Sequence, residues 1–286
     1  MSKYRSKLPQ LSDRLAGNYL SNPVRTFDQH SFNARVDHTM SSKDSLFVRF
    51  SFDSAKQFFP NGLPGFGSGP SAAFSTTDFD TQARNLAASW TRLFSSSKVN
   101  QATFGYNRVF NRMTSIGQGT NKSNEVGIPG ANLGQFVNSG LTNISIAGGY
   151  NRLGDRLFTP FIGGTQVYHV VDTFNWVAGR HSFKLGGSVR WMLMDTLGIT
   201  WPTGNFNFDG LFTAGFTATG ALDASTGNPM ASFLLGLPAS GSRSNQFGED
   251  IVYRRWNEYR GFAEDTLQLT NDLTLNYGLA YALTTP

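Results

Sequence analysis

Apolar and polar side chains alternate most regularly near the end of the chain. Between residues 273 and 281, leucine or tyrosine occupies every odd position, and small or polar residues occupy every even one. Side chains of a β-strand point to opposite faces in turn, so this pattern predicts a strand with one apolar face. The alternation also runs forward from Trp256, and Asn271 and Asp272 provide turn chemistry between the two halves. The stretch from Trp256 to Tyr281 is therefore a predicted β-hairpin.

Three earlier stretches show the same alternation around a tight turn. Their predicted spans are about 32–53, 82–110 and 166–194, with turns at residues 41–44, 95–98 and 178–180. The turns within hairpins are about two to four residues long, whereas the connections between hairpins run from about 25 to about 60 residues. The long connections contain predicted short strands at 143–146 and 205–208 and a predicted helical turn at 231–237.

This contrast between short turns and long connections indicates the class of fold. Structureless loops beyond about 12–15 residues are uncommon in compact soluble domains, whereas outer-membrane barrels combine short periplasmic turns with long extracellular loops. The predicted strands also reach the ~9–11 residues that a tilted strand needs to cross a bilayer. We therefore predict an all-β fold, an antiparallel up-and-down transmembrane β-barrel in the cell outer membrane. It has about eight main strands in four hairpins, with long extracellular loops.

Two domains are expected on this basis. Residues 1–28 are polar and irregular, and residues 29–286 form the predicted outer-membrane β-barrel domain, which is partial. Aromatic residues near one turn, Trp176 and Phe183, fit the girdle of rings found at a membrane–water boundary. Carboxylates at Asp172 and Asp265 fall on the apolar face, so we expect them near a membrane interface or out of the predicted register.

Composition agrees with a membrane barrel and narrows the chemistry. The chain is 39% apolar, 14% aromatic and only 15% charged, whereas a quarter charged is usual. It contains no cysteine, which excludes disulfides, thiolate metal sites and cysteine nucleophiles.

No apolar run is long enough for a membrane-spanning helix, and no signal peptide follows Met1. The protein is therefore either cytosolic or lacks its true N-terminus. The net charge is +5, and the Lys and Arg residues are spread along the chain rather than clustered, so we expect no nucleic-acid partner.

Several segments also carry a family resemblance. They are residues 28–38 with 42–51, residues 179–187, and residues 204–210 with 231–238 and 273–279. The Phe-Leu-Leu-Gly-Leu-Pro stretch at 233–238, at its distance after Phe-Asn-Phe at 206–208, is the most specific of them. Together they resemble the barrel of TonB-dependent transporters of the Oar-like type, over nearly everything from Asn18 onward.

The resemblance implies a 22-stranded barrel around a plug, with transport powered by an inner-membrane TonB complex. The sequence departs from that pattern because it has no plug, no TonB box and no terminal aromatic strand. We therefore expect part of a TonB-dependent receptor that takes up a large solute, either an internal fragment or a truncated gene product. The expected partners are outer-membrane lipid, the missing plug and barrel strands of the same receptor, and the TonB complex reached through that plug.

No residue pattern points to enzyme chemistry, so we expect a non-enzyme without catalytic, cofactor-binding or metal-binding residues and without a cofactor. His30 and His38 lie about 26 Å apart on one predicted strand, at about 3.3 Å per residue, and cannot share a metal. Glu264 is expected to be solvated or paired with Arg260. The glycine-rich stretch 65–69 does not match a nucleotide-binding motif.

Basic residues lie on the predicted polar face. They are Arg35, Arg49, Lys184, Arg190 and Arg260. They line either a substrate path or a wetted wall against a plug, and we favour the wall.

Two alternatives to the partial receptor remain open. One is a small eight-stranded outer-membrane barrel with a structural or adhesion role, which requires the first and last strands to pair. The other is a secreted carbohydrate-binding β-sandwich, in which a second layer covers the apolar face and Phe58, Phe59 and Trp201 stack on sugars. The partial receptor instead predicts an open, curved sheet with two unpaired edges.

Overall fold

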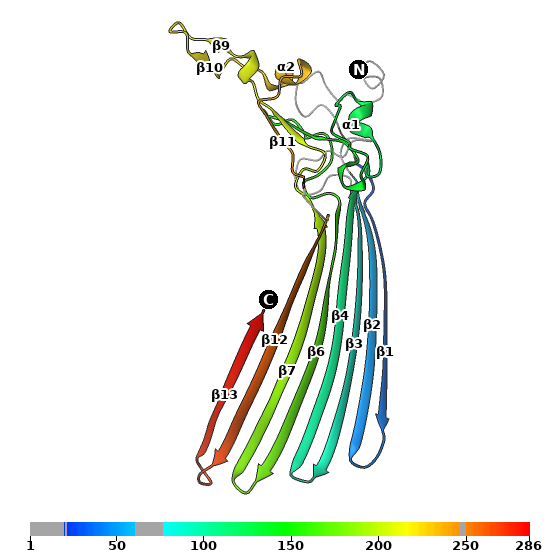
Figure 1. The fold of residues 1–286 in the computed structure, drawn as a ribbon, viewed down its shortest axis with the longest axis vertical. Helices are drawn as coiled ribbons and strands as arrows, with labels where there is room; N and C mark the ends of the chain where they lie inside the picture. The colour runs from blue at the N-terminus through cyan, green and yellow to red at the C-terminus, as the bar shows by residue number, and fades with distance from the viewer. Residues whose placement is uncertain (1–19, 21, 61–76, 246–249) are drawn as a thin grey trace.

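The computed structural model describes residues 20, 22–60, 77–245 and 250–286. The chain has two parts, a tall curved sheet and a smaller domain at one end of it (Figure 1). Tight turns close the sheet at the end away from this domain. The glycine-rich stretch 65–69 and most of the segment predicted as irregular lie outside the described residues, and β1 begins at Thr26, inside that segment.

Eight long strands form the sheet. They are β1 Thr26–Thr39, β2 Asp44–Phe59, β3 Thr77–Ser95, β4 Lys98–Ser115, β6 Phe161–Ala178, β7 His181–Gly198, β12 Ile251–Gln268 and β13 Thr274–Thr285. Their order in the sheet is β1-β2-β3-β4-β6-β7-β12-β13, and every neighbouring pair is antiparallel. All four predicted hairpins are confirmed. The strands are longer than predicted, because alternation weakens where they leave the membrane and the polar ends read as loop.

The smaller domain is built from the two long connections on either side of β6 and β7. The first holds α1 Lys122–Glu125, the 3-10 turn η1 Phe136–Asn138 and β5 Asn143–Ile146. The second holds β8 Asn205–Phe208, η2 Leu211–Thr213, β9 Gly215–Phe216, β10 Leu222–Asp223, α2 Pro229–Leu234 and β11 Ser240–Ser242. Both predicted short strands are confirmed. The predicted helical turn corresponds to α2, which starts earlier because Asn228 caps it by accepting a hydrogen bond from the Ala231 N–H at 3.0 Å.

The strand register gives the sheet one apolar and one polar face. Residues directly opposite each other in an antiparallel ladder point to the same side. The ladder places on one side, the outward face, Phe32, Ala34, Val36, Leu46, Val48, Phe50, Leu86, Ala88, Trp90, Ala102, Phe104, Tyr106, Tyr168, Val170, Phe174, Trp176, Leu185, Val189, Trp191, Tyr259, Leu275, Tyr277, Leu279 and Tyr281. The other side, the luminal face, is mainly polar or small. The predicted facing is therefore confirmed.

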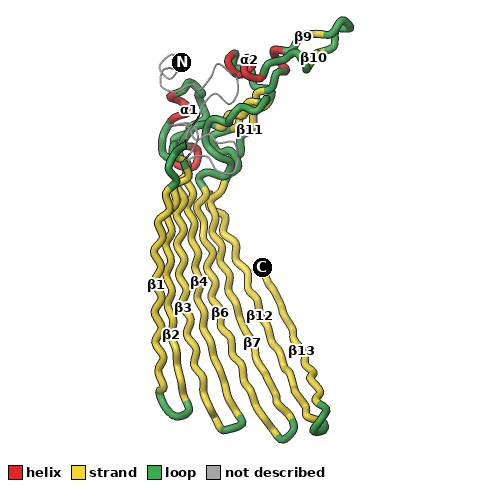
Figure 2. Tube along the Cα trace, turned by 180° about the vertical axis from the view of Figure 1, so that it is seen from behind, coloured by secondary structure: helices red, strands yellow, loops and turns green. Residues whose placement is uncertain are grey.

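Large apolar side chains of the outward face remain open to their surroundings. Leu279 is 78% exposed and Val36 is 67% exposed. No described residue forms a second layer over this face, which the rear view shows as a single sheet (Figure 2). The β-sandwich alternative is therefore wrong, because its core requires that second layer. None of the described helices is long and apolar enough to cross a membrane.

The sheet is open in the part of the chain that the structure describes. β1 and β13 stand at its two ends and do not pair with each other (Figure 1). This confirms the predicted open, curved sheet and gives no support to a small closed barrel of eight strands. Both edges carry backbone donors and acceptors that a lipid environment leaves without partners, so they require further strands.

The turn between β6 and β7 shows how local sequence sets the register. Ala178 pairs with His181, which leaves Gly179 and Arg180 as a two-residue loop. Such loops require positive φ, and Gly179 has φ +61°. The turn and the alternation on both sides agree, so the strands cannot slip by one residue without exposing polar groups to lipid.

Arginine substitutions on β13 test which face meets lipid. Leu279 lies on the outward face and its neighbour Ala280 lies on the luminal face at nearly the same depth. Leu279→Arg is expected to lower the free energy of unfolding from lipid vesicles by about 2–4 kcal/mol, whereas Ala280→Arg is tolerated. Equal losses for the two variants, measured by equilibrium unfolding in urea, would contradict the facing.

Candidate functional site

The two long connections fold together into one external domain. β5 from the first connection pairs in parallel with β8 from the second, and β11 pairs with the other side of β8. Ile144, Ile146 and Phe208 form the buried centre of this domain. The ring of Phe233 packs edge-on against Phe208 at a centroid distance of 5.2 Å. The connections are therefore a built structure rather than free loops.

Asp155 holds the first connection in shape. Its buried carboxylate accepts a hydrogen bond from the Leu141 N–H at 2.8 Å, and its backbone carbonyl accepts one from the Asn143 side chain at 2.9 Å. Gly140, with φ +103°, passes so close that a Cβ there would collide with the carboxylate. Burial raises the pKa of the Asp155 carboxyl to about 6.

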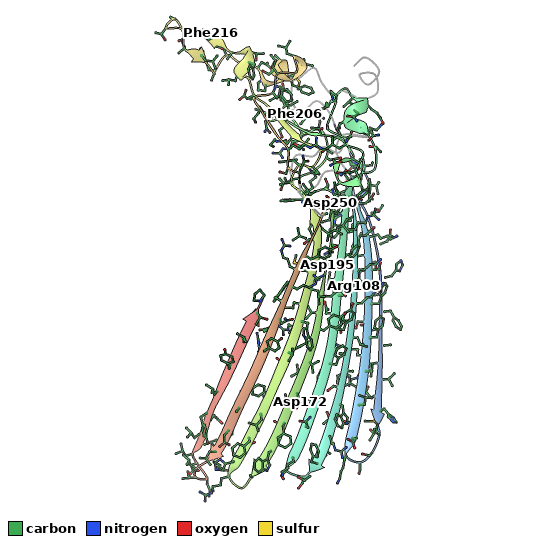
Figure 3. All side chains as sticks on the ribbon, viewed as in Figure 1. Arg108, Asp172, Asp195, Phe206, Phe216 and Asp250 are labelled. Carbon is green, nitrogen blue, oxygen red and sulfur yellow. The ribbon has the colours of Figure 1, made fainter. Side chains whose placement is uncertain are left out.

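An apolar cavity of about 700 Å³ opens in the external domain. Its walls come from both connections, and all its lining residues are apolar or glycine. They are Val126, Gly127, Ile128, Pro129, Leu141, Ile144, Leu153, Phe206, Phe208, Phe233, Leu234, Leu235, Gly236 and Pro238. Figure 3 labels Phe206 within this domain. The volume lies within the usual range for ligand pockets, about 300–1,000 Å³.

Only an indirect signal for this cavity is present in the sequence. The stretch 233–238 stood out by its family resemblance, and it now supplies five of the lining residues, counting Phe233, Leu234, Leu235, Gly236 and Pro238. Leu234 and Leu235 are 62% and 64% exposed. Solvent-exposed leucines at a cavity mouth fit a site for an apolar group.

A charged cluster lies on the luminal face of β7 and β12. Glu258 accepts a hydrogen bond from the Arg190 side chain at 3.0 Å and is also paired with Arg260. Glu264 was expected to be solvated or paired with Arg260. It is exposed, which agrees with the first alternative, and Arg260 pairs instead with Glu258 on the same strand face. The cluster borders a shallow hollow of about 530 Å³ that also touches His169 and Lys184.

The other predicted luminal basic residues lie across the sheet. Arg35 and Arg49 are directly opposite each other on β1 and β2. Arg35 is paired with Asp37 at 2.6 Å and lies over the ring of Phe47 at 4.4 Å. The structure does not bring Arg35 and Arg49 together with the cluster of Arg190 and Arg260, since four strands lie between β2 and β12. They extend the polar character of the wall.

Both carboxylates expected on the apolar face are there, so the register is correct at both positions. Asp265 accepts a hydrogen bond from the Tyr277 hydroxyl at 2.6 Å and lies 2.6 Å from His181 Nδ1, close to the turns. Asp172 lies deeper in the apolar face, so the expected interface position is wrong for it (Figure 3). The Asn100 side chain donates a hydrogen bond to it at 2.7 Å, which offsets part of the cost of its burial in lipid.

The described residues contain no group of three or more His, Cys, Asp or Glu side chains that could hold a metal ion. His30 and His38 both lie on β1, and His181 contacts Asp265. The prediction that this chain needs no catalytic residue or cofactor stays a prediction.

Comparison with known proteins agrees with this geometry. The profile of a family described as "Outer membrane beta barrel domain" matches residues 3–286. No significant match was found among curated proteins. Among solved structures, the chain is similar to the ferripyoverdine receptor of the outer membrane of Pseudomonas aeruginosa. That similarity has a TM-score of 0.51 and 9% identity, and covers 91% of this chain and 31% of the receptor.

Two further solved receptors show weaker similarity. One is the ferric-catecholate import receptor Fiu from E. coli K12 in its open form, with a TM-score of 0.45, 13% identity, and coverage of 90% of this chain and 37% of the receptor. The other is the siderophore receptor PiuA from Acinetobacter baumannii, with a TM-score of 0.39, 7% identity, and coverage of 91% and 39%. The chain thus spans roughly a third of the length of the receptors it matches.

The buried carboxyl of Asp155 predicts how the external domain responds to pH. Its folded pKa of about 6 lies above the ordinary value of about 3.9, so the folded domain binds this proton more tightly than the unfolded chain. The domain therefore gains stability as pH falls from about 6 to about 4, by at most about 3 kcal/mol, and lacks that gain at neutral pH. Hydrogen exchange across residues 141–155, corrected for intrinsic rates, measures the change.

Asp155→Asn is expected to remove this pH dependence, because it deletes the charge and keeps an oxygen acceptor for the Leu141 N–H. Asp223→Asn is the control in the same domain. Hydrogen bonds from Ser225 hold the pKa of the half-buried Asp223 carboxyl below its usual range, so its contribution has the opposite sign. Protection that stays flat between pH 6 and 4 in the unsubstituted protein would contradict the role of Asp155.

Proposed function

Because this chain belongs to the outer membrane β-barrel domain family, we propose that it is the wall of a receptor that takes up a large solute across the outer membrane. The chain is located in the outer membrane and forms part of a barrel like that of TonB-dependent receptors. The observation that carries the proposal is the external domain, which unites two long connections around an open apolar cavity above a polar luminal wall.

The solute first meets the external domain. Its cavity offers apolar contact without a charged side chain, so it takes an uncharged, apolar part of the solute. The luminal face then offers a wet surface with both signs of charge, including Arg190, Glu258 and Arg260. A polar wall of this kind lets a hydrated solute move without binding it too tightly to leave.

Partners outside this chain would close the barrel and supply the energy for transport. The two unpaired sheet edges fit further barrel strands of the same receptor, and the polar luminal wall fits a plug. A TonB complex in the inner membrane, acting through that plug, is the proposed source of energy. The ferripyoverdine receptor named above has a similar fold and is an outer-membrane receptor, and this supports a receptor role for this chain.

Acidic substitutions at the cavity mouth test its role in binding apolar groups. An apolar diazirine probe, applied to outer-membrane vesicles and activated by light, is expected to label residues 126–129 and 233–238. Changing Leu234 and Leu235 together to Asp should reduce that labelling at least about tenfold, because charges at the mouth disfavour an apolar occupant. Leu211→Asp is the control, since Leu211 is exposed in the same domain but does not line the cavity.

Labelling of the outward strand faces by probe dissolved in the lipid serves as an internal reference in the same sample. If the double variant and the Leu211→Asp control label 126–129 and 233–238 equally, the cavity does not bind apolar groups.

Uptake itself is tested by solute depletion. Cells with and without the gene for this protein are given the same complex medium, with and without an agent that collapses the proton gradient. At least one large solute should disappear from the medium only when the gene is present and the membrane is energised. Depletion profiles that do not depend on the gene, or that ignore the proton gradient, would contradict the proposed transport.

A further inference from the structure

Two arginines stand directly opposite each other on the outward face. Arg84 on β3 pairs with Arg108 on β4 in the strand register. Side chains at opposed positions have Cβ atoms about 4.5–5.5 Å apart, and like charges there destabilise a sheet. Arg84 is exposed and Arg108 is half-buried. In the part of the chain that the structure describes, neither guanidinium forms an ion pair with a carboxylate. The pair therefore lacks an anion.

The depth of the pair identifies its surroundings. One aromatic row of the outward face contains Trp176 and Phe183 near the turns, with ring centroids 5.3 Å apart. The other contains Tyr106 and Tyr168, with centroids 4.9 Å apart. Such rows mark the two membrane–water boundaries. The turns are the periplasmic end by their length, so the row at Tyr106 marks the outer leaflet.

Arg108 lies just beyond that outer row. It is ten residues along β4 from Lys98 (108 − 98), and Lys98 is opposite Trp176 in the inner row. At about 3.3 Å per residue and a tilt of about 40°, this is roughly 25 Å of height, which matches the apolar band of about 25 Å. In Figure 3, Arg108 and Asp195 lie well above Asp172, towards the external domain. Arg84 and Arg108 thus lie at the level of outer-leaflet headgroups.

A hollow of about 200 Å³ lies beside Arg108 on the side away from Arg84, towards β6 and β7, and leaves room next to the Arg108 guanidinium for part of a headgroup. Its lining includes Phe110, Gln166, Asp195 and Leu197. Gln166 is the next residue across the sheet from Arg108, and its side-chain oxygen accepts a hydrogen bond from the Tyr106 hydroxyl at 3.3 Å. That contact uses the side-chain oxygen of Gln166 and leaves its amide nitrogen as a donor next to Arg108.

The surrounding charges also favour an anion. Asp195, the carboxylate that borders the hollow, is paired with Arg255 at 2.5 Å. The other charged side chains of the outward face in this region are Lys56, Arg112, Asp28, Asp78 and Asp80, and Lys56 and Arg112 lie directly opposite Asp80. With Arg84, Arg108, Asp195 and Arg255, the region has five cationic and four anionic groups. The excess of positive charge is concentrated at Arg84 and Arg108.

We propose that Arg84 and Arg108 together bind the phosphate group of a phosphorylated lipid of the outer leaflet. Each guanidinium presents paired N–H donors that match two phosphate oxygens, and one phosphate between them cancels their mutual repulsion. The aromatic row below packs against the lipid chains, and Gln166 donates to the headgroup. This site is on the opposite face from the luminal wall, so it is independent of solute uptake.

The test uses the full protein extracted from outer membranes in mild detergent, with lipid A as the probe. Native mass spectrometry and thermal unfolding compare lipid A that carries its phosphates with the same lipid after dephosphorylation. The phosphorylated form is expected to bind and to raise the unfolding temperature, and the dephosphorylated form is expected to do neither. The variant with R84Q and R108Q should bind phosphorylated lipid A at least about tenfold more weakly.

A variant with R35Q and R49Q is the matched control, because these two arginines are also directly opposed but lie on the luminal face. It should bind phosphorylated lipid A like the unsubstituted protein. If the outward variant fails to fold, as judged by its mobility on unheated gels, a variant with R84K and R108K keeps the charges and should bind more weakly than the unsubstituted protein.

Three results would overturn the site. One is equal binding by the outward variant and the luminal control. Another is equal binding of phosphorylated and dephosphorylated lipid A. The third is a rise in unfolding temperature with inorganic pyrophosphate alone that equals the rise with phosphorylated lipid A. That result would assign the arginines to a free phosphate instead of a headgroup.

Discussion

The hydrogen-bond ladder between antiparallel strands is the interaction on which the rest of this protein depends. A bilayer offers no partner to a backbone N–H or C=O, so every such group in the membrane has to pair with a neighbouring strand. Seven antiparallel ladders join the eight long strands here. Once they form, the register decides which side chains meet lipid and which meet water. The unpaired edges of β1 and β13 show where the same requirement calls for more strands.

Much of the sheet could be predicted from the sequence because its signal is local. Alternation with period two gave the faces, and the tight turns at 41–44, 95–98 and 178–180 gave the register. Strand ends were less predictable, since β2 and β3 extend beyond the bilayer into water, where polar residues such as Lys56 and Asp78 break the alternation. In those segments, backbone hydrogen bonds to the neighbouring strand maintain the β-conformation although the side-chain alternation is lost.

The site depends on contacts between segments far apart in the chain, and such contacts have no periodic signal. The pairing of β5 with β8, the cavity between the two connections and the partner of Arg260 all needed the three-dimensional arrangement. The same holds for Arg84 and Arg108, which lie 24 residues apart (108 − 84) and meet only through the ladder. The protein therefore has three separate candidate binding surfaces. They are the external domain at one end of the sheet, the polar luminal face and the lipid-facing outward face.

Site-directed spin labelling along β13 tests the central claim most directly, and the absence of cysteine from the chain makes single labels simple to introduce. Labels are placed one at a time at residues 275–281 of the protein in lipid vesicles. Collision rates with oxygen, which concentrates in lipid, should be high at odd positions, and collision rates with a water-soluble nickel complex should be high at even positions. Accessibility without a period of two, or with the two sets exchanged, would contradict the assignment of the outward face to lipid.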